Sequence, residues 1–235
     1  MLVMAHQPPK ISIIVPVLNE AGAIGDALGP LKHDNVEVIV VDGGSSDETL
    51  DIVNRYPCRV MGSTKGRASQ MNKGAEAASG DILLFLHADT ILPESFTSYL
   101  QSDFWLSDRS WGRFDVRLGG EQPSFRVIEW FMNNRSRLTG VCTGDQAIFV
   151  RREAFEKVGG YALIPLMEDI ELSKSLKKIS PPFCVDTKLT TSSRRWESNG
   201  IVRTILLMWK LRLMHFAGVK GNALEKQYGR SPAPF

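Results

Sequence analysis

The most constraining feature of this sequence is the alternation, through its first half, of short apolar runs with segments of helical pattern. The runs are Ile11–Val15, Val36–Val41, Cys58–Met61 and Ile82–Leu86, and the segments between them are Ala21–Leu31, Asp47–Arg55 and Arg67–Ala78. Such runs are typical of strands buried in a parallel sheet, and the alternation is typical of βαβ crossovers. We therefore expect an α/β fold, Rossmann-like, with a mostly parallel central sheet and helices on both faces.

The second half of the sequence does not continue this regular alternation of strands and helices. It predicts a longer strand over 111–118, a helix over 125–137, a short strand over 146–150, and helices over 168–178 and 201–216. No Pro/Gly/Ser-rich linker separates the halves. We therefore expect one domain over residues 1–235, with a first half at 10–100, a second half at 101–198 and a C-terminal helical extension at 199–235.

Composition excludes several classes of protein. Lys and Arg number 28 against 26 Asp and Glu, so the basic excess of a nucleic-acid binder is missing. Cys58, Cys142 and Cys184 are far apart and predict neither a disulfide framework nor a zinc site. Residues 1–10 lack a signal-peptide pattern, and no stretch reaches the ~18 apolar residues of a membrane span. We expect a cytoplasmic protein.

Ligands of open α/β sheets bind beyond the carboxyl ends of the strands, so the residues after each run deserve inspection. The first run leads to Pro16, Val17 and Glu20, which suit either ligand contact or a turn into a helix. The second ends at Asp42 and Gly43, where a carboxylate can accept a hydrogen bond from a base or a ribose hydroxyl. The Ser45-to-Glu48 spacing that follows predicts a capping box.

The third and fourth runs lead to charged groups. Lys65 and Arg67 flank a glycine at a predicted helix start, which favours an anion site or a solvated helix face. His87 and Asp89 alternate with Ala88, so on extended backbone they point the same way and could hold a divalent cation. Asp89 could instead cap a turn.

Two features of the second half leave alternatives open. Glu168 and Asp169 begin a predicted helix, where acids complement the helix dipole, although Asp169 could also act as a general base. The segment 201–216 is apolar nearly all round, with Arg203 and Lys210 on one line and Arg212 on the far side. It is either packed against the sheet or a second subunit, or inserted in a membrane interface.

The order of these segments resembles the family-two glycosyltransferases of GT-A fold. The residues that carry the resemblance are Ile14–Glu20, Val41–Asp47, His87–Asp89, Phe149–Arg152 and Glu168–Asp169, within about residues 10 to 196. The sequences of Gly66–Asn72 and Gly144–Gln146 are similar to those of a narrower bacterial branch, whose members are often labelled arsenosugar-biosynthesis glycosyltransferases. That label is a poor guide to the acceptor.

The resemblance implies a nucleotide-diphosphate sugar as donor, bound by the first half, and an acceptor bound by the second. Asp169 would be the catalytic base, and Asp89 would hold Mn²⁺ or Mg²⁺ on the diphosphate, with His87 in place of the family's first acid. The glutamine of the family's QxxRW motif is replaced by Ser192, which argues against processive synthesis. The implied donor contacts are Pro16, Val17, Glu20, Asp42, Gly43, Lys65, Arg67 and Ala88, and the implied acceptor or supporting residues are Asp145, Glu168, Arg195 and Trp196.

The predicted function is therefore an inverting, metal-dependent transfer of a sugar to a small-molecule or lipid acceptor. The alternatives are a nucleotidyltransferase and a non-catalytic nucleotide-sugar binding module. A nucleotidyltransferase would carry a glycine-rich basic loop after the first strand, and residues 17–22 contain no Arg or Lys. Beyond the donor and acceptor, we expect no nucleic-acid partner, and either peripheral contact with the inner face of the membrane or a homodimer through the segment 201–216.

Overall fold

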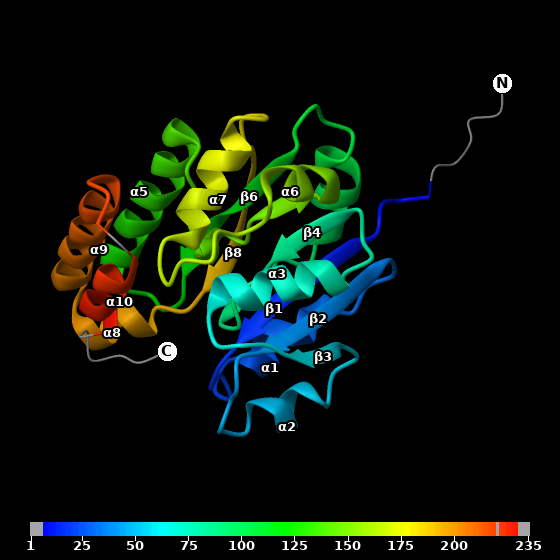
Figure 1. The fold of residues 1–235 in the computed structure, drawn as a ribbon, viewed down its shortest axis with the longest axis horizontal. Coiled ribbons are helices and arrows are strands. Elements are labelled where there is room, and N and C mark those ends of the chain that lie inside the picture. Colours follow the sequence, from blue (N-terminus) through cyan, green and yellow to red (C-terminus); the bar gives the residue numbers. More distant parts are fainter. Residues whose placement is uncertain (1–6, 220, 230–235) are drawn as a thin grey trace.

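The computed structural model describes residues 7–219 and 221–229, and its α/β architecture confirms the predicted fold class (Figure 1). One eight-stranded sheet has the order β3-β2-β1-β4-β7-β6-β8-β5. The pairs β1–β2, β1–β4, β2–β3 and β6–β8 are parallel, and those involving β7 or β5 are antiparallel. The predicted domain and its C-terminal extension include residues 1–6, 220 and 230–235, which lie outside the described residues.

The four apolar runs of the first half form strands close to their predicted limits. They are β1 (Ile11–Val17), β2 (Val36–Asp42), β3 (Arg59–Gly62) and β4 (Ile82–Phe85). Successive residues of β1 serve opposite faces: Ile13 packs with the cluster beneath α1 (Ile24–Leu28) and α2 (Thr49–Val53), and Ile14 packs with the cluster beneath α3 (Arg67–Ala77). Burial on both faces explains why β1, β2 and β4 are continuous apolar runs, whereas β3 lies at the edge of the sheet and is largely exposed.

The second half extends this sheet. The strand β6 (Trp111–Leu118) has the predicted limits, and β8 (Phe183–Thr191), which the sequence did not predict, pairs with it in parallel. The short β5 (Thr90–Ile91) pairs with the end of β8. The prediction of a strand over 146–150 was wrong at its start: Gly144–Gln146 forms a 3₁₀ turn, η3, and β7 runs from Phe149 to Arg151. Ala147, with φ of 46°, breaks the extended backbone between them.

The helices gather in three places. α3, α6 (Arg152–Val158) and α7 (Glu168–Lys177) lie on one face of the sheet, and α1 and α2 lie against the other face together with α4 (Phe96–Ser98) and the neighbouring π-turn η2 (Tyr99–Phe104). Gly29–Leu31 continues α1 as a 3₁₀ turn, η1. At one end of the molecule, α8 (Arg194–Asn199), α9 (Ile201–Phe216) and α10 (Gly221–Gly229) stand beside α5 (Pro123–Thr139) (Figure 1).

Two expectations for these elements have clear outcomes. The capping box was wrong: α2 begins at Thr49, whose N–H donates to Asp47 Oδ1 at 3.1 Å, while Ser45 Oγ donates to Asp42 Oδ1 at 2.6 Å. The nearer carboxylate takes the Ser45 hydroxyl, so Ser45 serves the strand end instead of the helix. Within the described residues, each helix is too short or too polar to cross a membrane.

Candidate functional site

A cleft of about 1650 Å³ lies at the carboxyl ends of β1 and β4, and residues of α5, α8, α9 and the start of α7 line its other side. Its volume exceeds that of an ordinary single-ligand pocket and suits two ligands together. All the site residues predicted from the sequence line it except Asp42 and Gly43: Pro16, Val17, Glu20, Lys65, Arg67, His87, Ala88, Asp89, Asp145, Glu168, Asp169, Arg195 and Trp196.

Asp42 stands next to the cleft, level with Val17 on the neighbouring strand. Its carboxylate accepts hydrogen bonds from the Gly44 N–H at 2.9 Å, from the Ser45 N–H at 3.0 Å and from the Ser45 hydroxyl. Asp42 therefore shapes the loop after β2, and its contact with a base stays a prediction.

The structure adds Gln70, a buried amide that sequence reasoning missed. Its Nε2 donates to the carbonyl oxygens of Val17 at 2.9 Å and Val41 at 2.8 Å, which ties together the ends of β1 and β2. A side chain at Gly43 would lie 3.2 Å from the Gln70 amide, which explains a glycine there. The one feature of the sequence that could have indicated Gln70 is its position, as a glutamine, on the inward face of a predicted helix.

The loop after β1 is fixed by polar contacts to the loop after β2. Asn19 has a left-handed φ of 55°, its N–H donates to Ser45 Oγ at 2.9 Å, and its Oδ1 accepts from the Ser46 N–H at 2.8 Å. The Glu20 N–H donates to Thr49 Oγ1 at 2.8 Å. These bonds hold Glu20 at the cleft, where burial raises the pKa of its carboxyl group against the opposing effect of a hydrogen bond from Arg194.

The segment after β4 differs from its prediction. The strand ends at Phe85, and the Thr90 N–H donates to the His87 carbonyl at 3.1 Å, which closes a turn. The assumption of extended backbone at 87–89 was therefore wrong. The two side chains meet different groups: Asp89 Oδ2 lies 3.6 Å from Arg194 Nη2, whereas the His87 ring packs on Gly144. Burial, and then the positive charge of Arg67, lower the pKa of His87 to about 4, so its imidazole is neutral near pH 7.

A divalent cation at this site would need ligands from the substrate. In the part of the chain that the structure describes, no three His, Cys, Asp or Glu side chains converge closely enough to hold a metal ion. Mg²⁺ is commonly bound by one or two carboxylates together with substrate phosphates. Asp89, a carboxylate that lines the cleft with 29% of its side chain exposed, fits that mode.

The first turn of α7 presents two acids to the cleft. Asp169 Oδ2 accepts a hydrogen bond from the Gly144 N–H, and Asp169 Oδ1 accepts one from the Ile170 N–H, both at 2.7 Å. These two bonds hold the carboxylate in one orientation. Burial raises the pKa of Asp169 despite these bonds. Burial, and then the charge of Asp169, raise the pKa of Glu168 to about 7, while Arg67 Nη1 lies 3.7 Å from Glu168 Oε1.

Basic side chains face these acids from several elements. Arg194 Nη2 lies 3.1 Å from Glu20 Oε2 and so bridges Glu20 and Asp89. The Arg195 guanidinium stacks 3.6 Å from the centre of the Tyr228 ring. Burial, and then the charge of Arg212, lower the pKa of Arg135 to about 10. Sequence reasoning missed Arg135, Arg194 and Arg212, because no local motif marks an arginine that a distant helix brings to a cleft.

The sequence pattern of "Glycosyl transferase family 2" matches residues 12–159 of this chain, which is more than half of it. The chain therefore belongs to glycosyl transferase family 2. The match runs from β1 through β7 and into α6, and it contains the carboxyl ends of β1, β2 and β4. Family membership confirms the resemblance to the family-two glycosyltransferases, while the narrower bacterial branch stays a prediction.

Among curated proteins, this family 2 chain is similar to a "PGL/p-HBAD biosynthesis glycosyltransferase" of Mycobacterium tuberculosis, with 33% identity over 174 residues. The match covers 66% of this chain and 64% of that protein. A second relative is the "Probable glycosyltransferase YdaM" of Bacillus subtilis, with 27% identity over 192 residues, 70% of this chain and 46% of that protein. The chain thus spans less than two thirds of the length of these relatives.

Among solved structures, Staphylococcus aureus TarS 1–349 in complex with UDP aligns with a TM-score of 0.64 and 18% identity, over 78% of this chain and 60% of that one. The mannosyltransferase PcManGT from Pyrobaculum calidifontis, in complex with GDP-Man and Mn²⁺, aligns with a TM-score of 0.59 and 21% identity, over 88% of this chain and 65% of that one. At this level of identity the likeness supports the shared GT-A-like fold.

Proposed function

We propose that this family 2 chain is an inverting glycosyltransferase that moves a sugar from a nucleoside-diphosphate sugar to an acceptor hydroxyl. One observation carries the proposal: a single cleft brings the oriented Asp169 carboxylate together with Asp89 and a set of basic side chains. The relatives named as glycosyltransferases, and the fold neighbours solved with UDP or with GDP-Man and Mn²⁺, support the same class of donor.

Asp169 is the base in this proposal. The acceptor oxygen attacks the anomeric carbon, its proton passes to the Asp169 carboxylate, and the bond from that carbon to the diphosphate oxygen breaks in the same step. Hydrogen bonds from the Gly144 and Ile170 N–H groups fix the orientation of the carboxylate. Burial makes the carboxylate a stronger base, because it raises the pKa of Asp169 towards the working range of a general base.

The departing diphosphate needs positive charge. Lys65 and Arg67 line the cleft beside the start of α3, and Arg194 lies over the ends of β1 and β4. A Mn²⁺ or Mg²⁺ ion held by Asp89 and the diphosphate oxygens would neutralise part of the developing negative charge. Arg194 occupies the neighbourhood of Asp89, so it must move or share this carboxylate when the donor binds.

The proposal extends to the number of transfers and to the acceptor. The substitution of Ser192 for the glutamine of the processive motif favours a single transfer per acceptor. The acceptor is a small molecule or a lipid, and it enters from the side of α5 and α9. The relatives carry names other than arsenosugar enzymes, so the narrower branch suggested by Gly66–Asn72 remains a prediction.

The test uses a panel of UDP- and GDP-sugars with Mn²⁺ and measures release of nucleoside diphosphate. We expect Asp169→Asn to lower the rate about 10²- to 10⁴-fold, with nucleotide binding retained in calorimetry. Asp103→Asn, at an exposed acid outside the cleft, is the matched control and should leave the rate unchanged.

Three results would contradict the proposal or one of its parts. Nucleotide binding without release from any donor would favour a binding module. Pyrophosphate release from a nucleoside triphosphate and a sugar phosphate would favour a nucleotidyltransferase. An unaltered rate in Asp169→Asn would remove Asp169 from the role of base.

A further inference from the structure

The outer side of α9 carries a continuous stripe of exposed apolar side chains. Val202, Leu206, Trp209, Leu213 and Phe216 follow one another at intervals of four, three, four and three residues, and each is between 61% and 84% exposed. This spacing keeps them on one side of a helix. The opposite side of α9 holds the buried Leu211 and Thr204, so the expectation that this helix packs against the protein holds for its inner side alone.

A second stripe lies on the neighbouring helix α5. Val127, Trp130, Phe131 and Leu138 are each at least 56% exposed, and the rings of Trp130 and Phe131 meet edge to face at 5.0 Å. The two helices are in contact, because Ile201 and Ile205 of α9 pack on the cluster that contains Phe125 and Ile128 of α5. The two stripes are called here the α5–α9 surface. Exposed apolar surfaces of this extent usually mark a binding face.

The α5–α9 surface continues into the cleft. Val127, Phe131 and Trp209 belong to it and also line the cleft, and Leu163, 74% exposed, lies on the same rim. Any molecule that covers the α5–α9 surface therefore lies at the opening of the cleft, on the side from which the acceptor is proposed to enter. The lining that these two helices supply also includes Arg135 and Arg212, so the passage from the surface into the cleft combines apolar and basic side chains.

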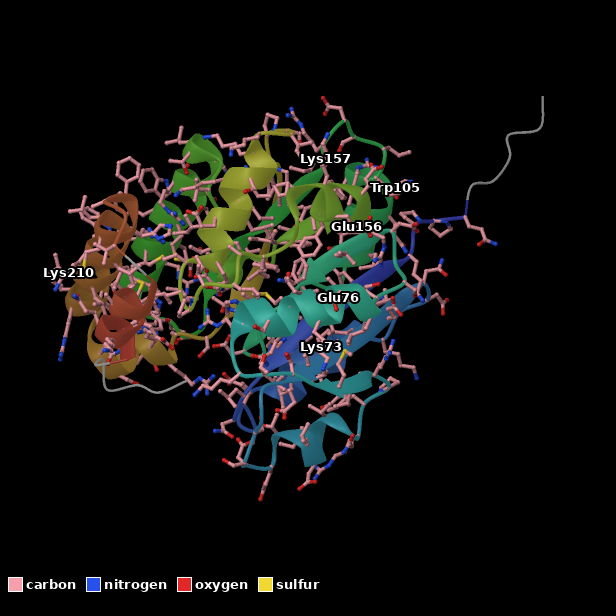
Figure 2. The ribbon with its side chains drawn as sticks, viewed as in Figure 1. Lys73, Glu76, Trp105, Glu156, Lys157 and Lys210 are labelled. Atoms are coloured by element: carbon pink, nitrogen blue, oxygen red, sulfur yellow. The ribbon has the colours of Figure 1, made fainter. Side chains whose placement is uncertain are left out.

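The charges beside the stripe of α9 are basic. The sequence of α9 contains Arg203, Lys210, Arg212 and His215 and no acid. At 100° per residue, Arg203 and Lys210 lie along one flank of the stripe, and Arg212 lies on the other flank, where it lines the cleft. Figure 2 shows Lys210 projecting outward from α9, away from the body of the molecule. Apolar and aromatic side chains flanked by Lys and Arg are typical of helices that lie in the interface of an anionic bilayer.

A second copy of the chain suits this surface less well. The spacing of the stripe is that of a coiled-coil seam, which a symmetric partner could cover. In such a pair the flanking positions face each other, and here they are occupied by Arg203, Lys210 and Arg212. Like charges would then meet across the two-fold axis and oppose association. The same charges favour an anionic lipid surface.

We propose that the α5–α9 surface docks on a bilayer containing anionic lipids, with the apolar stripes in the interface and the exposed Arg203 and Lys210 at the headgroups. Docking in this way turns the mouth of the cleft towards the membrane. If the proposed glycosyl transfer is correct, the acceptor is then a lipid that reaches the cleft from the bilayer, and this consequence rests on the proposed function.

The test measures flotation of the full chain with two kinds of vesicle, phosphatidylcholine alone and phosphatidylcholine mixed with phosphatidylglycerol. We expect binding to the mixed vesicles, and at least about a tenfold loss of partitioning in the double variant Leu206→Glu, Leu213→Glu. Leu106→Glu is the matched control, because Leu106 is 83% exposed and lies outside both stripes. Arg203→Gln with Lys210→Gln should weaken binding to the anionic vesicles.

The outcomes separate this proposal from the proposed function. Leu206 and Leu213 do not line the cleft, so calorimetry with UDP and GDP on each variant should give the wild-type result and exclude misfolding. Failure of the full chain to float with either vesicle would overturn the docking proposal, as would light scattering that detects a dimer dissociated by the double variant. Vesicle binding with no release of nucleoside diphosphate from any donor would leave docking intact and refute the glycosyl transfer.

Discussion

Gly144→Ala is the substitution whose effect the structure determines most closely. A methyl group at this position would lie 2.7 Å from Cε1 of His87 and closer still to its Nε2, so one of the two residues must move. The backbone of Gly144 is not in the left-handed region, and alanine is therefore acceptable there except for this contact. The Gly144 N–H also donates to Asp169 Oδ2, so a displaced backbone would release the proposed base.

The expected cost follows from these two contacts. Overpacking of a well-packed site typically costs about 1–3 kcal/mol of unfolding free energy. For a chain of this size, each kcal/mol lowers the melting temperature by about 2–4 °C. Loss of the N–H···carboxylate bond removes a contact that favours the charged form of Asp169, so the pKa of Asp169 should rise further.

A double-mutant cycle tests this reasoning. Urea unfolding is measured for the wild type, Gly144→Ala, His87→Ala and the double variant. Removal of the imidazole leaves room for the new methyl group, so Gly144→Ala should cost close to nothing when His87 is already alanine. The coupling free energy should be about 1–3 kcal/mol. Additive costs in the two single variants would refute the argument, because the contact with His87 would then play no part.

Three further predictions concern the cleft. Asp89→Ala should raise the barrier to nucleoside-diphosphate release by several kcal/mol, whereas His87→Ala should cost less. Full activity of the wild type in EDTA, together with full activity of Asp89→Ala, would exclude the metal role. Asp42→Asn should weaken nucleotide affinity in calorimetry more than it changes turnover, since the carboxylate organises the loop at Gly44 and Ser45; unaltered affinity would limit Asp42 to the turn. Because the pKa of Glu168 is raised from 4.5 to about 7, its contribution to folding is largest below about pH 4.5 and is lost as pH rises through about 7. The variant Glu168→Gln, which mimics the protonated acid, should therefore gain stability relative to the wild type in urea unfolding between pH 5 and pH 8; a constant difference would contradict the raised pKa.

Much of the first half of the chain could be predicted because its signals are local. A strand buried on both faces is apolar throughout, so β1, β2 and β4 are visible as runs, and a parallel sheet must present their carboxyl ends at one edge. His87 and Asp89 follow the end of β4, Lys65 and Arg67 follow the edge strand β3, and all four line the cleft. Local pattern failed where a residue had two available partners, as at Ser45, which bonds to Asp42 instead of capping α2.

The sequence by itself thus determined the α/β class, the strands of the first half and most of the residues at the cleft, because each depends on neighbours within a few positions. Tertiary structure alone decided how those residues are paired. Arg194 reaches Glu20 across 174 positions of sequence, and Asp169 accepts from the N–H of Gly144 across 25. Such contacts depend on how distant elements pack, and packing arises from the sum of many weak contacts that no single segment encodes. For the same reason, the apolar pattern of 201–216 predicted a helix, but only the packing of α9 on α5 and α10 fixed which of its sides is left exposed.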